Sequence, residues 1–513
     1  MSRKWSLRAC YGIAIYLGAI SIGLLSTSSM LWDAVYQHVV IVIGFFGLWR
    51  FSWWSNHVIR ALIYSRVVFP RMRSNADRAW ISGARPRRLH FMMTTFLERP
   101  HVTEAVVNSI IDEVRSCGIP ATLWLGSGDE IDEKQVASII LANAKDAPLN
   151  LVIARQDRPG KRYAIGMALR AIRQADIAPD NIVIFMDGDS IIERGMLQKC
   201  VPLFGLDPQL GALTTDERVD VDGPGWVSAW LSMRFAQRRV AMQSHALSGR
   251  ILTLTGRLSL FRARYVIESQ FIHIVEEDHL DHWLWGRFRF LSGDDKSTWY
   301  YMLRSGARMI YVPDARCITM EHVEGNGYER MVQNLRRWSG NMLRNGSRAI
   351  ALGPRRIGFF TWWCLVDQRI AMWTMLISPV LALSGVMLAS PVFIATYFTW
   401  ILATRLAQSF VLWLYSDEID LRYPVLLYAN QLLNAAVKVY CLFRLSKQRW
   451  TNRGNQSAGF SGSLTDGVRV IMAGYLTSVA LLFLVLVTIT YAGFVKPPSI
   501  ETFGLIAARG LAR

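Results

Sequence analysis

The hydrophobic pattern divides the chain into long apolar stretches and one long polar block. Five stretches have the length and apolarity to cross a membrane: Tyr11–Leu31, Ala34–Trp54, Ala371–Leu388, Val392–Leu414 and Val470–Val495. The first is not a cleavable signal peptide, because its apolar run is long and a second span follows almost at once. The pattern therefore predicts a multi-pass membrane protein. Its predicted parts are a transmembrane hairpin (1–55), a polar domain (56–345), an interfacial helix region (346–370), a second hairpin (371–414), an interfacial helix with a cytoplasmic loop (415–469), a last span (470–495) and a tail (496–513).

Between residues 85 and 345 the pattern becomes that of an α/β domain. Short apolar runs predict strands at Leu89–Met93, Ala121–Leu125, Asn150–Ala154, Ile182–Met186 and Met309–Val312. Amphipathic stretches predict helices at Val102–Arg115, Glu133–Ala144 and Arg162–Gln174. Such alternation favours a mostly parallel sheet with helices on its faces. Ligands of these sheets bind at the carboxyl ends of the strands.

Two segments behind the fourth span are predicted from the residues that interrupt or follow their apolar runs. Tyr423–Phe443 is apolar, but Asn430 and Lys438 lie within it, so we predict an interfacial helix rather than a sixth span. The glycine- and serine-rich run Gly454–Ser463 predicts a mobile loop.

The formal net charge of +18 has two explanations. Lys and Arg collect on the cytoplasmic side of membrane proteins, and basic residues flank both ends of the first hairpin, which places the polar domain in the cytoplasm. The second explanation is an anionic partner, such as a sugar nucleotide or an acidic polymer. Nucleic acid is excluded, because the basic residues are dispersed and no binding motif lies among them. The six cysteines have no paired spacing, so we expect reduced thiols and no zinc site.

Asp187 and Asp189 directly follow the predicted strand Ile182–Met186. Two carboxylates one residue apart can hold a hard cation, Mg²⁺ or Mn²⁺, against a diphosphate. The alternative is an ordinary acidic turn, since Asp and Gly are common turn residues.

Asp294 and Asp295 precede a predicted helix at Thr298–Arg304. Adjacent carboxylates at a helix start can simply favour the helix N-terminus. The functional alternative is a general base that takes a proton from an acceptor hydroxyl, with Asp295 as the base and Asp294 as its orienting neighbour.

Arg336, Arg337 and Trp338 lie in a predicted helix just before the membrane segments return. They fit a positive cytoplasmic flank with an interfacial Trp. They also fit a guanidinium clamp for a leaving diphosphate, with an indole ring for stacking on a sugar.

These strings, in this order, resemble the processive, membrane-embedded family 2 glycosyltransferases, which include the cellulose, hyaluronan and chitin-oligosaccharide synthases. Asp187-Gly188-Asp189 matches their D-x-D motif, Gly293-Asp294-Asp295 their T-E-D motif, and the string ending at Arg337-Trp338 their Q-x-x-R-W motif. Counting back from Trp338 places Asn334, not Gln333, at the Gln position. The resemblance implies a GT-A catalytic domain between transmembrane helices, and a metal held by Asp187 and Asp189. It also implies donor-binding and gating residues: Thr95, Glu98, Asp129 and Lys161 for the donor, and Trp450 and Arg453 in a gating loop.

Within this family, the run from Leu291 to Asp314 is most similar to the catalytic subunits of bacterial alginate synthases. That resemblance implies GDP-mannuronate as donor, β-1,4-polymannuronate as product and the bacterial inner membrane as location. The string Gly126-Ser127-Gly128-Asp129 departs from the family's uridine-binding D-D-G-S. The alternative is a polymer made from a UDP-sugar. No cyclic-dinucleotide sensor is appended, so cyclic di-GMP would act through a separate membrane co-polymerase, and the polymer would pass to periplasmic export proteins.

Arg405 and Gln408 lie in the middle of a predicted span. An arginine at that depth is costly unless it faces protein or a wet cavity. It either has a structural partner or lines a channel for the growing anionic polysaccharide. Two other hypotheses stay open from the sequence: a catalytically idle scaffold for a secretion complex, and a transferase that adds a single sugar to a lipid carrier.

Overall fold

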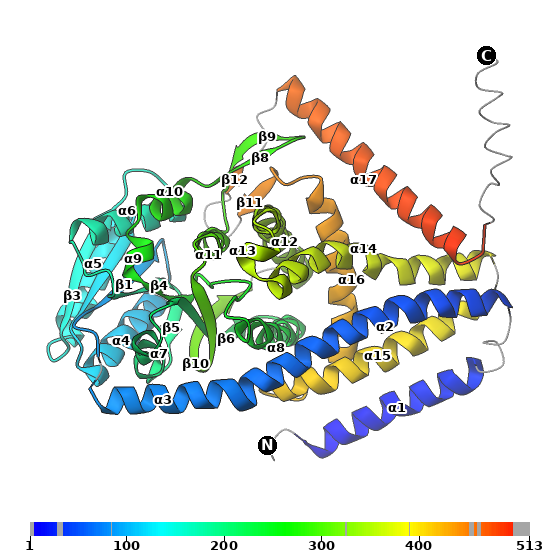
Figure 1. The fold of residues 1–513 in the computed structure, drawn as a ribbon, viewed down its shortest axis with the longest axis horizontal. Helices are drawn as coiled ribbons and strands as arrows, with labels where there is room; N and C mark the ends of the chain where they lie inside the picture. Colours follow the sequence, from blue (N-terminus) through cyan, green and yellow to red (C-terminus); the bar gives the residue numbers. More distant parts are fainter. Residues whose placement is uncertain are drawn as a thin grey trace.

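A computed structural model describes residues 5–27, 34–83, 85–323, 326–388, 390–450, 456–458 and 463–495. An α/β domain lies at one end of the molecule and long helices extend from it to the other (Figure 1). The α/β domain is built on an eight-stranded sheet. In spatial order its strands are β3 (Leu149–Arg155), β2 (Ala121–Ser127), β1 (Leu89–Thr95), β4 (Ile182–Asp187), β7 (Leu258–Arg262), β6 (Leu210–Asp222), β10 (Arg308–His322) and β5 (Ser190–Ile192).

The sheet is mostly parallel, as predicted. Strands β3, β2, β1 and β4 run parallel, β7 is antiparallel to both its neighbours, and β6 pairs parallel with β10. All seven residues of β1 and of β2 are buried, which explains their continuous apolar character. The helices of the domain are α4 (Pro100–Cys117), α5 (Glu130–Asn143), α6 (Lys161–Gln174), α7 (Met196–Leu206), α8 (Gly225–Ala246), α9 (Ala263–Val266), α10 (Ser269–Glu277), α11 (Asp294–Arg304), α12 (Gly327–Ala351) and α13 (Pro354–Ile357).

Local sequence signals set several of the helix ends. Pro100 begins α4 at the position where its missing N–H costs nothing, and Gly118 ends it in the left-handed conformation with φ 66°. Asp129 caps α5 by accepting a hydrogen bond from the Ile131 N–H at 2.7 Å. The Asn326 side chain caps α12 in the same way through Tyr328 N–H.

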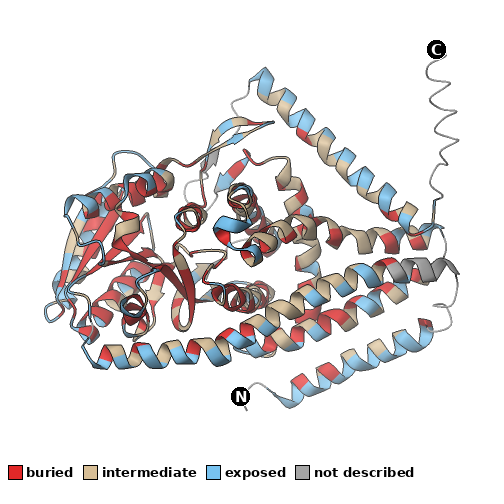
Figure 2. Cartoon of the chain, viewed as in Figure 1, coloured by how far each residue is buried: buried red, intermediate tan, exposed pale blue. Residues whose placement is uncertain are grey.

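The helices outside the α/β domain carry the apolar segments. They are α1 (Leu7–Thr27), α2 (Ala34–Ile63), α3 (Phe69–Ile81), α14 (Phe359–Leu388), α15 (Phe393–Tyr415), α16 (Tyr423–Leu442) and α17 (Leu464–Tyr491), with a π-helical turn at Tyr64–Val68 joining α2 to α3. Figure 2 shows that buried residues gather in the α/β domain, whereas much of α1 and α17 is exposed. Side chains such as Leu25 and Phe483 are exposed there, as expected of helices that face lipid.

Four helices among the described residues are long and apolar enough to cross a membrane: α1, α14, α16 and α17. Helix α16, which we predicted to lie at the interface, is in this set. Helices α2 and α15, which contain two of the predicted spans, are not, and α15 carries Arg405 and Gln408 in its middle. The course of each helix through the membrane remains a prediction.

Two short hairpins complete the fold. One pairs β8 (His279–His282) with β9 (Gly286–Arg289), and the other pairs β11 (Gln448–Trp450) with β12 (Gln456–Ala458). The prediction of a loop over Gly454–Ser463 is therefore wrong for the three residues of β12, because they gain backbone hydrogen bonds to β11.

Candidate active site

The strand ends of β1 and β4 form one wall of a large cavity. Asp187 is the last residue of β4 and lies opposite Thr94 of β1. Gly188 follows so closely against β1 that an added Cβ would lie 2.8 Å from the Thr94 carbonyl oxygen. A glycine at this position therefore lets the chain turn tightly and present both Asp187 and Asp189 to the cavity.

Lys161, the first residue of α6, joins two of the predicted motifs. Its Nζ atom lies 2.6 Å from Asp187 Oδ1 and 3.3 Å from Asp294 Oδ2. Gly256 backs this cluster, since a Cβ there would lie 3.6 Å from Lys161 Nζ and from a carboxylate oxygen of each aspartate. Residues far apart in the chain thus meet in a small charged cluster with open space beside it.

Asp294 and Asp295 form the first turn of α11, after Gly293 in the left-handed conformation at φ 90°. A Cβ at Gly293 would lie 2.7 Å from the Asn341 side chain, so both its backbone and its packing favour glycine. The aspartates occupy the helix N-terminus, as the structural alternative required, but both also line the cavity. Their position therefore serves the helix and leaves the carboxylates available for chemistry.

The two aspartates have opposite pKa shifts. Burial alone would raise the pKa of Asp294, but the nearby cations Lys161 and Arg162 lower it below its ordinary value. Burial, followed by the negative charge of Asp294, raises the pKa of Asp295. This difference suits one carboxylate that stays ionised and another that can accept a proton.

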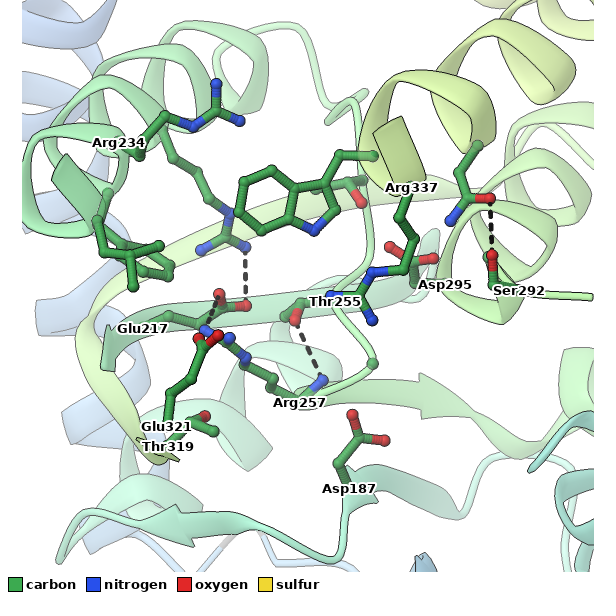
Figure 3. A pocket seen from close by; sticks show the side chains of 18 of the residues that line it. Asp187, Glu217, Arg234, Thr255, Arg257, Ser292, Asp295, Thr319, Glu321 and Arg337 are labelled. Atoms are coloured by element: carbon green, nitrogen blue, oxygen red, sulfur yellow. Dashed lines mark hydrogen bonds and ion pairs between the residues drawn. The ribbon is translucent and has the colours of Figure 1, made fainter. Parts of the chain in front are cut away.

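Helix α12 brings Arg337 and Trp338 to the same cavity. Arg337 points into it beside Asp295, with Asp187 across from them (Figure 3), and burial lowers the pKa of this arginine. Arg336 is exposed instead, and its guanidinium lies 4.7 Å from the centre of the Tyr440 ring. Of the two arginines in the motif, Arg337 is the one that can reach a ligand in the cavity.

Trp338 lies in an aromatic and cationic setting. Its ring stacks on Trp230 with 6.0 Å between centroids, and the Arg234 guanidinium lies 5.0 Å from its ring centre. Gln333 also lines the cavity, whereas Asn334 is buried and accepts a hydrogen bond from Arg337 at 3.4 Å. Gln333, not Asn334, is therefore the side chain available to a ligand.

Of the predicted donor residues that follow the other strands, Glu98 lines the cavity and Thr95 and Asp129 do not. Glu98 lines the cavity, and Thr95 is buried just before it, where it donates a hydrogen bond to Asp132 Oδ2 at 3.0 Å. Asp129 is not among the lining residues, because its carboxylate caps α5. A donor role for Asp129 stays a prediction without support from this geometry.

The remaining predicted residues lie away from the cavity or outside the described residues. Arg405 is buried, donates to Thr404 Oγ1 at 3.1 Å and lies 5.7 Å from the Tyr428 ring centre. Gln408 accepts from Gln431 Nε2 at 3.4 Å. Trp450 belongs to β11, and Arg453 lies outside the described residues. Arg405 therefore has protein partners, and neither it nor Gln408 lines this cavity.

Similarity to known proteins settles which family this arrangement belongs to. The chain is 37% identical over 454 residues to the glycosyltransferase alg8 of Pseudomonas syringae pv. tomato, covering 88% of this chain and 91% of that protein. It is 36% identical to glycosyltransferase alg8 of Azotobacter vinelandii, with the same coverage. This chain belongs to the Alg8 family of glycosyltransferases.

A model of glycosyltransferase-like family 2 also matches residues 86–341, which include the motifs at Asp187, Asp295 and Arg337. Among solved structures, a mannosyltransferase from Pyrobaculum calidifontis in complex with GDP-Man and Mn²⁺ is similar, with a TM-score of 0.41 and 19% identity. That match covers 75% of this chain and 99% of the mannosyltransferase. The predicted membership of family 2 and the predicted enzymatic class are both confirmed for this Alg8-family chain.

The cavity of the Alg8-family chain also contains a charged group that the sequence did not indicate. Glu217, in β6, lies 3.3 Å from both Arg238 and Arg257, and all three line the cavity (Figure 3). Burial alone would raise the pKa of Glu217, but the two arginines lower it. Arg257 also interacts electrostatically with Asp189 and Glu321. Single charged residues in separate elements carry no local signal, so only the fold could bring them together.

Proposed function

We propose that this enzyme polymerises mannuronate from GDP-mannuronate into β-1,4-linked polymannuronate, the precursor of alginate, and passes the product across the inner membrane. One observation carries the proposal. One cavity of about 1620 Å³ is lined by Lys161, Asp187, Asp189, Asp295 and Arg337, and also by Leu365 and Gln368 of α14 and Lys438 of α16. A growing chain could therefore extend from the reaction centre directly toward the membrane helices.

The donor end of the cavity suits a nucleoside diphosphate with a divalent metal. Asp187 and Asp189 offer the hard oxygen ligands that Mg²⁺ and Mn²⁺ prefer, and the space beside Gly256 leaves room for a ligand. When bound, such an ion would neutralise negative charge on the diphosphate. Lys161 supplies a second positive charge at the same end, held in place by Asp187 and Asp294.

The reaction follows from the position of Asp295. The acceptor hydroxyl oxygen attacks the anomeric carbon, and the bond from that carbon to the diphosphate oxygen breaks with its electron pair leaving on GDP. Asp295 takes the hydroxyl proton. Its raised pKa makes it a better proton acceptor than an ordinary carboxylate, while Asp294 stays ionised against Lys161.

The clamp serves the leaving group and the acceptor. Arg337 is half-buried beside the reaction centre, where a guanidinium stabilises a developing anionic charge more than it would in water. Trp338 offers a ring face for the acceptor sugar at the start of the exit path.

Two cations in the cavity wall support an anionic acceptor. Arg234 and Lys438 line the cavity and repel each other electrostatically, although Asp367 partly offsets the charge of Lys438. Like charges in a half-buried wall repel each other less when an anion lies between them. The carboxylates of a uronate polymer would supply such anions at each sugar.

The membrane arrangement completes the proposal. The basic residues after α2 favour a cytoplasmic catalytic domain. A separate membrane co-polymerase that binds cyclic di-GMP, together with periplasmic export proteins, would regulate and receive the product.

A donor comparison tests the function. Membranes containing this chain and its co-polymerase would be given radiolabelled GDP-mannuronate, UDP-glucose or UDP-N-acetylglucosamine, and the products would be separated by size. We expect a long polymer from GDP-mannuronate alone. A polymer from a UDP-sugar alone would overturn the donor assignment and retain polymerisation, whereas a short glycolipid would overturn polymerisation itself.

A further inference from the structure

Three potential metal ligands meet on helices that also carry residues of the cavity wall. They are His57 near the end of α2, His245 at the end of α8, and Cys364 in the second turn of α14. One ligand atom from each lies within 4.8 Å of the other two. None of the three lines the active-site cavity, so glycosyl transfer does not explain the cluster.

Hydrogen bonds orient His57 toward the thiol. Its Nδ1 atom lies 2.9 Å from Ser244 Oγ, and its Nε2 atom lies 3.9 Å from Cys364 Sγ. A ring nitrogen hydrogen-bonded to an oxygen, with the other nitrogen free to ligate, is the usual arrangement of a metal-binding histidine.

His245 lacks a partner that its burial demands. Only 1% of this residue is exposed, and its Nδ1 atom has no hydrogen-bond partner among the described residues. A buried polar atom without a partner costs free energy, so an unpaired nitrogen beside two other ligand atoms points to a missing ligand.

Charged residues near the cluster include one that opposes a bound cation and one that favours it. Arg60 lies over the Phe360 ring at 3.7 Å and interacts electrostatically with both His57 and Cys364. Its positive charge opposes a bound cation. Asp367, ion-paired to Arg50 at 2.7 Å, also interacts with Cys364 and partly offsets the positive charge.

We propose that His57, His245 and Cys364 bind a borderline or soft metal ion of the Zn²⁺ class, with a water molecule as the fourth ligand. A point no farther than about 2.8 Å from all three ligand atoms exists, given their separations, and zinc needs about 2.0–2.3 Å. Movements of less than about one ångström would therefore complete the site. The ligand set contains nitrogen and sulfur, unlike the all-oxygen set of Asp187 and Asp189.

The ion would fasten three parts of the molecule together. Helix α2 belongs to the amino-terminal hairpin, α8 to the α/β domain and α14 to the later membrane helices (Figure 1). Met242 of α8 and Leu365 of α14 line the active-site cavity, close in sequence to two of the ligands. Metal binding here would hold together the helices that carry these wall residues, independently of which sugar the enzyme transfers.

Metal content and cobalt spectroscopy test the proposal on the full-length chain in detergent. We expect about one equivalent of zinc after exposure to ZnCl₂ and dialysis, and a cysteine-to-cobalt charge-transfer band in the near ultraviolet after Co²⁺ loading. Because the band requires a sulfur ligand, metal at Asp187 and Asp189 cannot produce it. Wild-type protein that shows neither the zinc nor the band would overturn the proposal.

Cysteine variants provide the matched comparison. Cys364→Ser should lose the band and retain about one-tenth or less of the zinc, whereas Cys441→Ser, which changes another buried thiol, should retain both. Equal zinc and an unchanged band in Cys364→Ser would also overturn the site. These measurements do not involve sugar transfer. The metal-site proposal can therefore be wrong while the proposed function is right, and the proposed function can be wrong while the metal site is right.

Discussion

The donor end and the acceptor end of the active-site cavity are built differently. At the donor end, short sequence strings fix the geometry: a strand, a tight glycine turn and a helix start place Asp187, Asp189 and Lys161. At the acceptor end, Arg234, Trp338 and Lys438 come from three helices far apart in sequence. At the donor end Lys161 is paired with two carboxylates, whereas at the acceptor end Arg234 and Lys438 repel each other. Under the proposed function, nucleotide recognition is local in the sequence, whereas polymer recognition depends on how the helices pack.

The largest expected effect comes from the base that lies between the two ends. Asp295→Asn keeps the shape of the side chain but cannot accept the hydroxyl proton, so polymer synthesis should fall about 10²- to 10⁴-fold. Donor binding, measured as the Kd of GDP-mannuronate, should stay nearly unchanged because Lys161 and Asp187 are intact. A variant that still polymerises at the wild-type rate would remove Asp295 from the mechanism.

The next effect separates the two adjacent arginines of α12. Arg337→Lys should lower kcat by about 10²- to 10³-fold, because lysine cannot reproduce the forked hydrogen bonding to a diphosphate. Arg336→Lys is the matched control, since Arg336 is exposed and lies against Tyr440 rather than in the cavity. Equal losses in both variants would show that the motif acts through overall charge and not through Arg337.

Substitution of Gly188 tests whether the donor end depends on the tight turn after β4. Gly188→Ala places a methyl group 2.8 Å from the Thr94 carbonyl, which forces the strand ends apart at a cost of about 1–3 kcal/mol. We expect about a tenfold rise in the donor KM, with acceptor use little changed. Gly205→Ala, in the exposed part of α7 with no atom within 4 Å of the new carbon, should behave as wild type.

Substitution of Arg234 tests the acceptor end in the same way. Arg234→Gln removes a positive charge beside Trp338 without removing an ion pair. Polymer length and the rate of elongation should fall about fivefold or less, and the loss should shrink as salt is raised. Donor KM should not move. A rise in donor KM instead would show that the two ends are not separate.

The donor end could be predicted from the sequence because short, contiguous strings of residues build it. The strand that ends at Asp187 and the helix at Lys161 appear where periodicity placed them, whereas α11 begins at Asp294, four residues before the predicted start at Thr298. The role of Asp129 was harder to predict, because a carboxylate that caps a helix and one that binds a ligand look alike in sequence. Glu217, Arg257 and Arg234 carried no local signal, since their partners come from other elements. The same is true of His57, His245 and Cys364, whose spacing suggested no metal site.

The pH dependence gives the finest test of how the two aspartates share their roles. Activity requires Asp295 to be ionised, so the acid limb of the pH–rate profile should follow its pKa, which burial and then the charge of Asp294 raise. Asp294→Asn removes that negative charge and frees Lys161 from one of its two carboxylate neighbours. Both changes stabilise the ionised form of Asp295, so its pKa falls and the acid limb moves to lower pH. The measurement is kcat/KM for GDP-mannuronate across the acid range in wild type and variant. A limb that stays in place, or moves to higher pH, would assign the titration to a different group and separate Asp295 from the observed proton transfer.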